Sequence, residues 1–138
     1  MSLRCRLQQV ARQYGAELEF VNLGTDTAGE TVQNRIKLCT QLEGQDLISA
    51  FYHELGHAHF YSRGIHKDYH EPEEFEASDK YCNWRKALTV EREVDDWAEQ
   101  EARKHGYGGV YKFYHQEPQH KLRALLQTFQ PKCCGRRK

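Results

Sequence analysis

The segment that most constrains this chain is "FYHELGHAH", residues 51–59. It contains the pattern H-E-x-x-H, in which His53 and His57 are four residues apart. On a helix, two residues at this spacing share one face, with their side chains about 5–6 Å apart. That separation lets two imidazole nitrogens reach one tetrahedral zinc ion. The pattern therefore predicts a helix with His53 and His57 as metal ligands.

The same helix has a separate packing face. The apolar side chains that would anchor it in a core are Leu47, Phe51, Leu55 and Ala58. Glu54 lies next to the ligand face, where it can reach a metal-bound water without being a ligand itself. Asp46 is suitably placed to cap this helix, which should end near Ser62, before Gly64. We therefore expect Glu54 to be the general base of the site.

A catalytic zinc ion needs a third protein ligand and an open fourth position. The metzincin pattern H-E-x-x-H-x-x-G-x-x-H is excluded, because Phe60 and Arg63 stand where it requires glycine and histidine. The gluzincin arrangement takes a glutamate from a second helix, commonly with an acidic or amide residue four positions later. The pattern E-x-x-x-D occurs once in the chain, at Glu91 and Asp95.

Glu91 is the predicted third metal ligand, and Asp95 the predicted outer partner that accepts the free N–H of a ligand histidine. Glu93 is the alternative ligand, and it points about 200° around the helix from Glu91, so the two cannot both serve. His59 lies about 200° from His57 and cannot bind the same ion, so we expect it to be structural or exposed.

The cysteines and the charge balance bear on the cellular setting. Five scattered cysteines without a C-x-x-C pair favour reduced thiols and a cytoplasmic protein over a disulfide framework. Lysine plus arginine equals aspartate plus glutamate at 20 each, which makes nucleic acid an unfavoured partner. The chain has no apolar run of transmembrane length and no secretory signal, so no membrane partner is expected.

Periodicity and turn residues predict one α+β domain over residues 1–130, with a flexible tail at 131–138. We expect a short antiparallel or mixed sheet packed against helices that include the H-E-x-x-H helix and a second ligand-bearing helix. The expected elements are a helix over 3–14, strands over 17–23 and 32–41, a turn over 24–31, and helices over 46–62, 90–105 and from about 118. Residues 65–89 look irregular, with at most a short helix after Pro72. The strand over 32–41 is expected to offer a free edge to an extended peptide.

The two motifs in this order resemble those of the ImmA/IrrE family of zinc peptidases. That family's second motif is approximately E-x-E-A-[ND]-x-[FW]-A, and "EREVDDWA" at 91–98 differs from it by valine in place of alanine. The resemblance covers roughly residues 3–105. It implies a gluzincin-like, zincin-type fold in which zinc is held by His53, His57 and Glu91, with Glu54 as general base. The family is common in phages, prophages and bacterial stress systems, and its better understood members cleave a repressor-type DNA-binding protein.

The sequence thus predicts a zinc-dependent peptidase that acts on a protein or peptide. The alternative is a catalytically inert, zinc-stabilised protein-binding module, which a fourth protein ligand would favour. The candidates for that fourth ligand are His66, His70 and Cys82. The sequence does not choose among the candidates for transition-state stabilisation, which are His66, His70, Tyr111, Tyr114 and His115.

Overall fold

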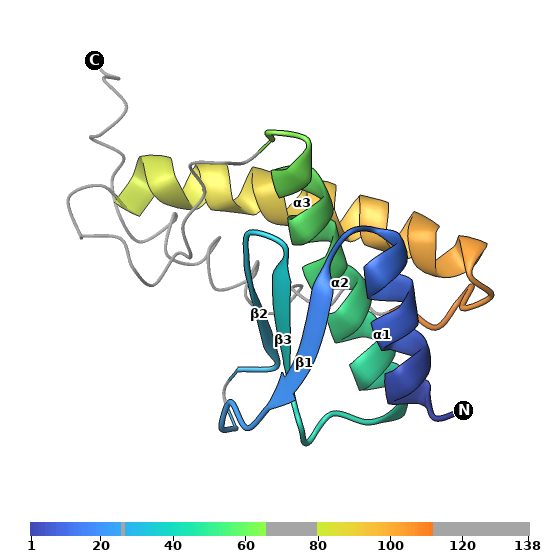
Figure 1. The fold of residues 1–138 in the computed structure, drawn as a ribbon. Helices are drawn as coiled ribbons and strands as arrows, with labels where there is room; N and C mark the ends of the chain where they lie inside the picture. The colour runs from blue at the N-terminus through green and yellow to red at the C-terminus, as the bar shows by residue number, and fades with distance from the viewer. Residues whose placement is uncertain (26, 66–79, 112–138) are drawn as a thin grey trace, which may run out of the picture. The chain divides into compact units, whose positions relative to one another are not determined.

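The computed structural model describes residues 1–25, 27–65 and 80–111, and within 80–88 it describes the backbone alone. In chain order, the elements of this part are α1 (Leu3–Gln13), β1 (Glu17–Val21), β2 (Gly29–Val32), β3 (Arg35–Cys39), α2 (Gly44–Ser62) and α3 (Lys80–Lys104) (Figure 1). These elements are consistent with the predicted small α+β domain.

Helix α1 confirms the predicted first helix. The Ser2 side chain caps it by accepting a hydrogen bond from the backbone N–H of Cys5. Leu7 and Ala11, one turn apart, are its buried residues. Gly15, with φ of 75°, ends the helix in the left-handed region that glycine adopts without strain.

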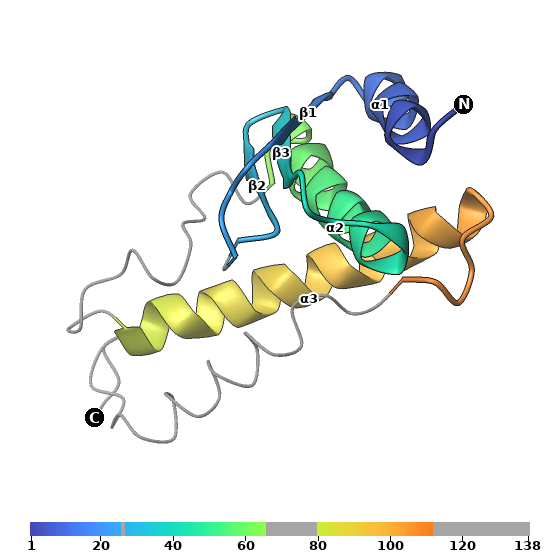
Figure 2. The ribbon, with the colours of Figure 1, turned by 90° about the horizontal axis from the view of Figure 1, so that it is seen from below.

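The sheet has the order β1-β3-β2, with β1 parallel and β2 antiparallel to β3, so it is mixed. Along β3, Ile36 and Leu38 are buried while Arg35 and Lys37 are exposed. This alternation places one face of the sheet against a core and the other face in solvent. Helices α1 and α2 cover the buried face (Figures 1 and 2).

Strand β2 was not predicted as a separate strand, because residues 29–31 were expected to be part of a turn and Val32 to begin the next strand. It is joined to β3 by a tight turn in which Gln33 has φ of 59°. Sequence patterns find such hairpins through Asn-Gly or Asp-Gly pairs, and neither occurs here. The expectation of a free edge on the strand over 32–41 was also wrong. Most of that segment forms β3, which is paired on both sides, and the outer strands of the sheet are β1 and β2.

Helix α2 carries the H-E-x-x-H motif and ends at Ser62 as predicted. It begins at Gly44 with Glu43 at the N-cap, so Asp46 lies in the first turn rather than at the cap. An acidic residue there still interacts favourably with the helix dipole. The helix is buried almost continuously from Leu47 to Leu55, which explains why its sequence is apolar on more than one face.

Helix α3 begins at Lys80, ten residues before the predicted start. The expectation of irregular structure was wrong for residues 80–89. These residues contain neither glycine nor proline, so nothing in them breaks a helix that continues through residue 104. The helices expected after Pro72 and from about residue 118, and the tail at 131–138, lie outside the described residues.

The chain divides into two units. The first consists of Met1–Ile65 and Val94–Tyr114, and contains α1, the sheet, α2 and the C-terminal part of α3. The second consists of His66–Glu93 and His115–Lys138, of which the structure describes residues 80–93. A single domain over 1–130 stays a prediction.

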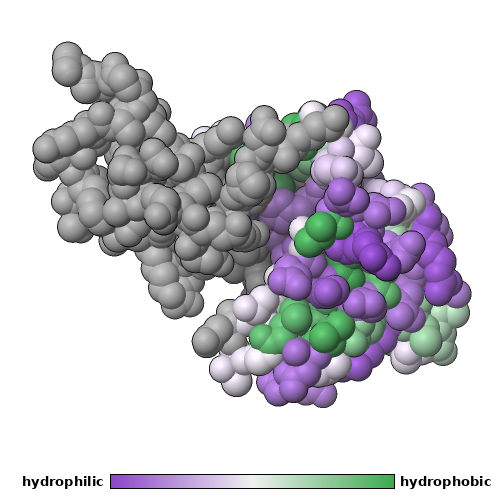
Figure 3. Space-filling view, turned by 60° about the vertical axis from the view of Figure 1, so that its left-hand side comes forward, coloured by the Kyte–Doolittle hydropathy of each residue, from purple (hydrophilic) through white to green (hydrophobic). Residues whose placement is uncertain are grey.

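One face of the described surface is mostly polar. On the face drawn in Figure 3, hydrophilic residues cover most of the coloured surface, and apolar residues form small groups among them. Val32 on β2 is one of the large apolar side chains that are exposed, at 65%. No helix in the described ranges is long and apolar enough to cross a membrane.

Candidate metal centre

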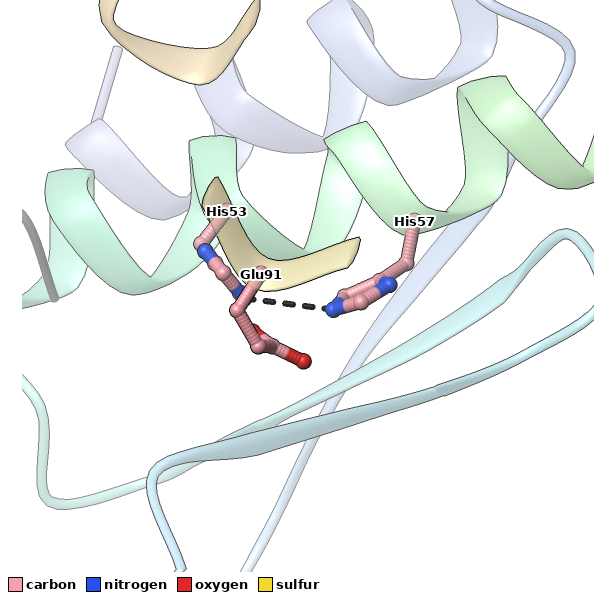
Figure 4. A group of neighbouring side chains, drawn as sticks. All are labelled: His53, His57 and Glu91. Carbon is pink, nitrogen blue, oxygen red and sulfur yellow. Dashed lines mark hydrogen bonds between the residues drawn. The ribbon is translucent and has the colours of Figure 1, made fainter. Parts of the chain in front are cut away.

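The two motif histidines project from the same side of α2 (Figure 4). His53 is fully buried and His57 is partly buried. Their Nε2 atoms are 3.2 Å apart. Two nitrogens bound to one tetrahedral zinc ion at about 2.0–2.1 Å lie about 3.3 Å from each other. The imidazoles therefore have the spacing of two ligands of a single ion.

Glu91 is the third member of the group. The carboxylate of this residue lies beside the two imidazoles (Figure 4), and the potential ligand atoms of His53, His57 and Glu91 all lie within 4.8 Å of one another. Glu91 is 4% exposed, whereas the alternative ligand Glu93 is exposed. Two imidazoles and one carboxylate form a donor set that zinc accepts. In the described part of the chain, no other group of three acidic, histidine or cysteine residues could hold a metal ion.

Asp95 lies one turn after Glu91 on α3 and is 2% exposed. The Nδ1–H of His53 donates a hydrogen bond to Asp95 Oδ1, at 3.0 Å. A proton on Nδ1 leaves the lone pair of Nε2 available, and Nε2 is the atom that faces His57. Asp95 therefore fixes the tautomer and the ring orientation that a metal ligand requires.

Tyr111 lies behind His53 rather than in front of the donor atoms. Its buried hydroxyl donates a hydrogen bond to Asp95 Oδ1 at 2.5 Å and lies 3.4 Å from Nδ1 of His53. Both contacts are on the side of the ring opposite Nε2. This position does not suit Tyr111 for stabilising a transition state. The spacing of the motifs gives no signal for the contact, because a glycine-rich turn separates Tyr111 from α3.

Glu54 follows His53 on α2 and is 5% exposed. The hydroxyl of Thr31, on β2, donates a hydrogen bond to Glu54 Oε1 at 2.6 Å. Gly29 lets β2 pass this close to α2, because a Cβ on Gly29 would lie 3.1 Å from Glu54 Cγ and 2.8 Å from Leu38 Cδ2. Strand β2 thus holds the carboxylate of Glu54, a contact that the sequence did not predict.

Gly56, in the middle of the motif, allows α2 and α3 to approach closely. A Cβ at this position would lie 2.9 Å from Val94 Cγ1 and 3.2 Å from Trp97 Cε3. Val94 and Trp97 flank Asp95 on α3. The absence of a side chain at Gly56 therefore sets the distance between Asp95 and the histidines.

His59 is not part of the metal group. Its ring stacks on the indole of Trp97, with centroids 4.6 Å apart and planes 16° apart. Burial, and then the positive charge of Arg63, lower the pKa of His59, so the neutral ring is favoured. The structure describes no side chain for His66, His70, Cys82, Tyr114 or His115.

Comparison of the chain with protein-family models, with curated proteins and with solved structures gives no match. A functional assignment therefore has to rest on the motifs and on the geometry of the site.

Proposed function

We propose that this chain is a zinc-dependent peptidase of the ImmA/IrrE type that hydrolyses a peptide bond in a protein substrate. The observation that carries the proposal is the convergence of His53, His57 and Glu91, whose ligand atoms lie within 4.8 Å of one another. A buried glutamate, Glu54, follows the first of these ligands directly on the same helix.

The composition of the group favours a catalytic over a structural site. Structural zinc sites are closed by four protein ligands, usually rich in cysteine, whereas hydrolytic sites take three ligands and leave one position open. Among the described residues the group has three members, and none is a cysteine. When bound, zinc supplies Lewis acidity that polarises the scissile carbonyl and lowers the pKa of a water molecule towards neutrality.

Glu54 is the residue proposed to move the proton. Its carboxylate accepts a proton from the attacking water and returns it to the amine that leaves. The hydrogen bond from Thr31 holds Oε1 in one orientation and leaves the other oxygen to act as the acceptor. Burial of Glu54 limits competition from bulk solvent for this proton.

The edge strand provides a means of holding a polypeptide. Within the described residues β2 pairs with β3 on one side, so its other edge can pair with an extended peptide. Because Thr31 lies on β2, a peptide that pairs with this strand is brought close to Glu54. The resemblance to the ImmA/IrrE family extends the proposal to a repressor-type regulator, encoded by a phage or mobile element, as substrate.

The cytoplasm is the proposed compartment. Cys5 and Cys39 are free thiols in the structure, as expected of a protein from a reducing environment.

The test compares the wild-type protein with Glu54→Gln, both loaded with zinc and incubated with a peptide library derived from a bacterial proteome. Mass spectrometry identifies new termini. We expect cleavage by the wild type and a loss of about 10²–10⁴-fold in the variant, the usual contribution of a general base. Zinc content should be unchanged, because Glu54 is not a ligand.

Equal cleavage by the two proteins would refute the role of Glu54. A wild-type protein that binds zinc but produces no cleavage, with peptides or with a candidate repressor, would instead favour the zinc-stabilised binding module. Measuring zinc content in the same samples separates this outcome from a failure to bind metal.

A further inference from the structure

Three polar groups from separate parts of the chain meet behind the metal centre. Asp95 Oδ1 accepts hydrogen bonds from both His53 Nδ1–H, at 3.0 Å, and the Tyr111 hydroxyl, at 2.5 Å. The hydroxyl and Nδ1 are themselves 3.4 Å apart. All three side chains are buried. A hydrogen bond to a charged acceptor in such a site is worth more than one between neutral groups.

The chain reverses direction after α3, and this reversal brings Tyr111 back to Asp95 and His53. Asp95 lies nine residues before the end of α3, which is about 13 Å back along the helix. Gly106 and Gly109, with φ of 93° and 81°, reverse the chain after Lys104. The side chain of Gln45, at the start of α2, then holds the carbonyl of Val110 at 2.7 Å. Tyr111 thus follows directly after an anchored residue.

We propose that Tyr111 is a positioning residue of the metal centre: its hydroxyl fixes the Asp95 carboxylate, and through it the ring of His53. A carboxylate is free to rotate about its Cβ–Cγ bond unless its oxygens are held. With Oδ1 held by Tyr111, rotation of the His53 ring away from its metal-binding orientation breaks a bond to a fixed acceptor. Metal affinity therefore depends on a residue that touches neither the metal ligands' donor atoms nor the ion.

This inference rests on the metal centre of the proposed function, and its test does not require catalysis. Tyr111→Phe removes the hydroxyl and keeps the ring. Tyr107→Phe is the matched control, because it is the same substitution in the same turn and its hydroxyl accepts a hydrogen bond from Arg6 Nη1 at 3.3 Å. Zinc dissociation constants of the full chain are measured by competition with a chromophoric chelator.

We expect Tyr111→Phe to weaken zinc binding by about tenfold, at the lower end of the range for outer-shell partners, and Tyr107→Phe to leave it unchanged. The d–d spectrum of the cobalt-substituted protein should also change in Tyr111→Phe alone. Equal affinity and equal spectra in the two variants would overturn the proposal.

A double-mutant cycle with Asp95→Ala tests the route. If Tyr111 acts through Asp95, Tyr111→Phe should have less than a twofold effect on zinc affinity in the Asp95→Ala background. A full tenfold effect there would mean that Tyr111 acts by another route, and the proposal would be wrong.

A measurement on the unmutated protein covers the case in which a variant does not fold. In the zinc-loaded wild type, NMR should detect a slowly exchanging Tyr111 hydroxyl proton with a nuclear Overhauser effect to the Nδ1 proton of His53. Absence of that contact would also overturn the proposal. If zinc binding weakens as expected but no peptide is cleaved, the positioning role stands and the peptidase function fails.

Discussion

Helix α3 carries buried carboxylates at two places, and their surroundings differ. Glu91 and Asp95 lie at the metal centre, whereas Glu101 lies near the C-terminal end of the helix. Glu101 is 8% exposed and accepts a hydrogen bond from the Tyr14 hydroxyl. The ammonium group of Lys104 lies 2.9 Å from Glu101 Oε2. This second carboxylate is therefore neutralised by groups of the chain itself.

The ring of His105 completes this second cluster. Its Nδ1 lies 2.7 Å from the Tyr52 hydroxyl, and its Nε2 lies 3.3 Å from the Tyr14 hydroxyl. Burial raises the pKa of both tyrosines, and the negative charge of Glu101 adds to the effect. Both hydroxyls thus stay protonated at neutral pH.

The comparison shows what separates a structural polar cluster from a candidate site. Around Glu101, the carboxylate faces the Tyr14 hydroxyl and the Lys104 ammonium group, so donors and acceptors match. At the metal centre, two imidazole nitrogens and a carboxylate oxygen converge within 4.8 Å, and all three are groups that donate electron pairs to a cation. A cation is the partner that such a convergence fits.

The largest expected effect on zinc affinity comes from comparing the same Glu→Gln substitution at the metal centre and at the second cluster. Glu91→Gln should weaken zinc binding more than about 100-fold, since even outer-shell changes cost about 10- to 100-fold. Glu101→Gln should leave the zinc dissociation constant within about twofold. Chelator competition measures both. Similar losses in the two variants would mean that Glu91 is not a ligand and that the contrast drawn above is false.

Gly56→Ala should give an intermediate effect. A methyl group at this position would lie 2.9 Å from Val94 Cγ1 and 3.2 Å from Trp97 Cε3, so these two side chains of α3 must move. Overpacking of this kind costs about 1–3 kcal/mol, more than the helix propensity gained from alanine. Urea unfolding of the apo protein should show the loss, and zinc affinity should fall with it. A stabilised protein with unchanged affinity would contradict the role of Gly56 as spacer.

The smallest effect concerns acid stability and Glu101. Burial alone would raise the pKa of Glu101, but the hydrogen bonds from Tyr14 and Lys104, together with the positive charges of Lys104 and His105, lower it below its usual value of 4.5. A depressed carboxyl pKa stabilises the fold above the unfolded-state value, and this contribution is lost as the pH falls through the folded-state pKa. Glu101→Gln should therefore cost about 1 kcal/mol at neutral pH and progressively less as the pH falls through the folded-state pKa of Glu101.

Urea unfolding of the apo proteins at several pH values measures this difference. A gap between wild type and Glu101→Gln that grows towards low pH would have the wrong sign and would refute the assignment. Lys104→Gln is a useful companion variant, because it removes the ammonium group that pairs with Glu101. It should reproduce part of the stability loss of Glu101→Gln, with the same dependence on pH.

The sequence predicted those parts of the site that follow from the helical repeat of side chains. The helical spacing of His53, Glu54 and His57 predicts the residues that α2 contributes to the site, and the single E-x-x-x-D pattern predicts Glu91 and Asp95. Glu91 lies on the same side of α3 as the buried residues Val94 and Ala98, whereas Glu93 is exposed, so the apolar face of the helix distinguishes the two glutamates.

The parts that the sequence did not predict depend on contacts between distant residues. Strand β2 is held by its pairing with β3. The turn residue Gln33 has a positive φ, which is uncommon for a residue other than glycine, so its sequence does not indicate the turn. Thr31 and Tyr111 join the site through side chains that belong to no motif. The early start of α3 was missed because a helix can continue through polar residues when nothing breaks it.

The spacing of residues along α3 has a consequence for how this gene can change. Glu91, Asp95 and the two residues that pack against Gly56, Val94 and Trp97, all lie on one uninterrupted helix, α3. Inserting one residue between Glu91 and Asp95 would rotate Glu91 by about 100° about the helix axis and move it by about 1.5 Å along it. Substitutions on the exposed side of this helix would be tolerated, but an in-frame insertion or deletion between Glu91 and Asp95 would abolish the metal centre in one step.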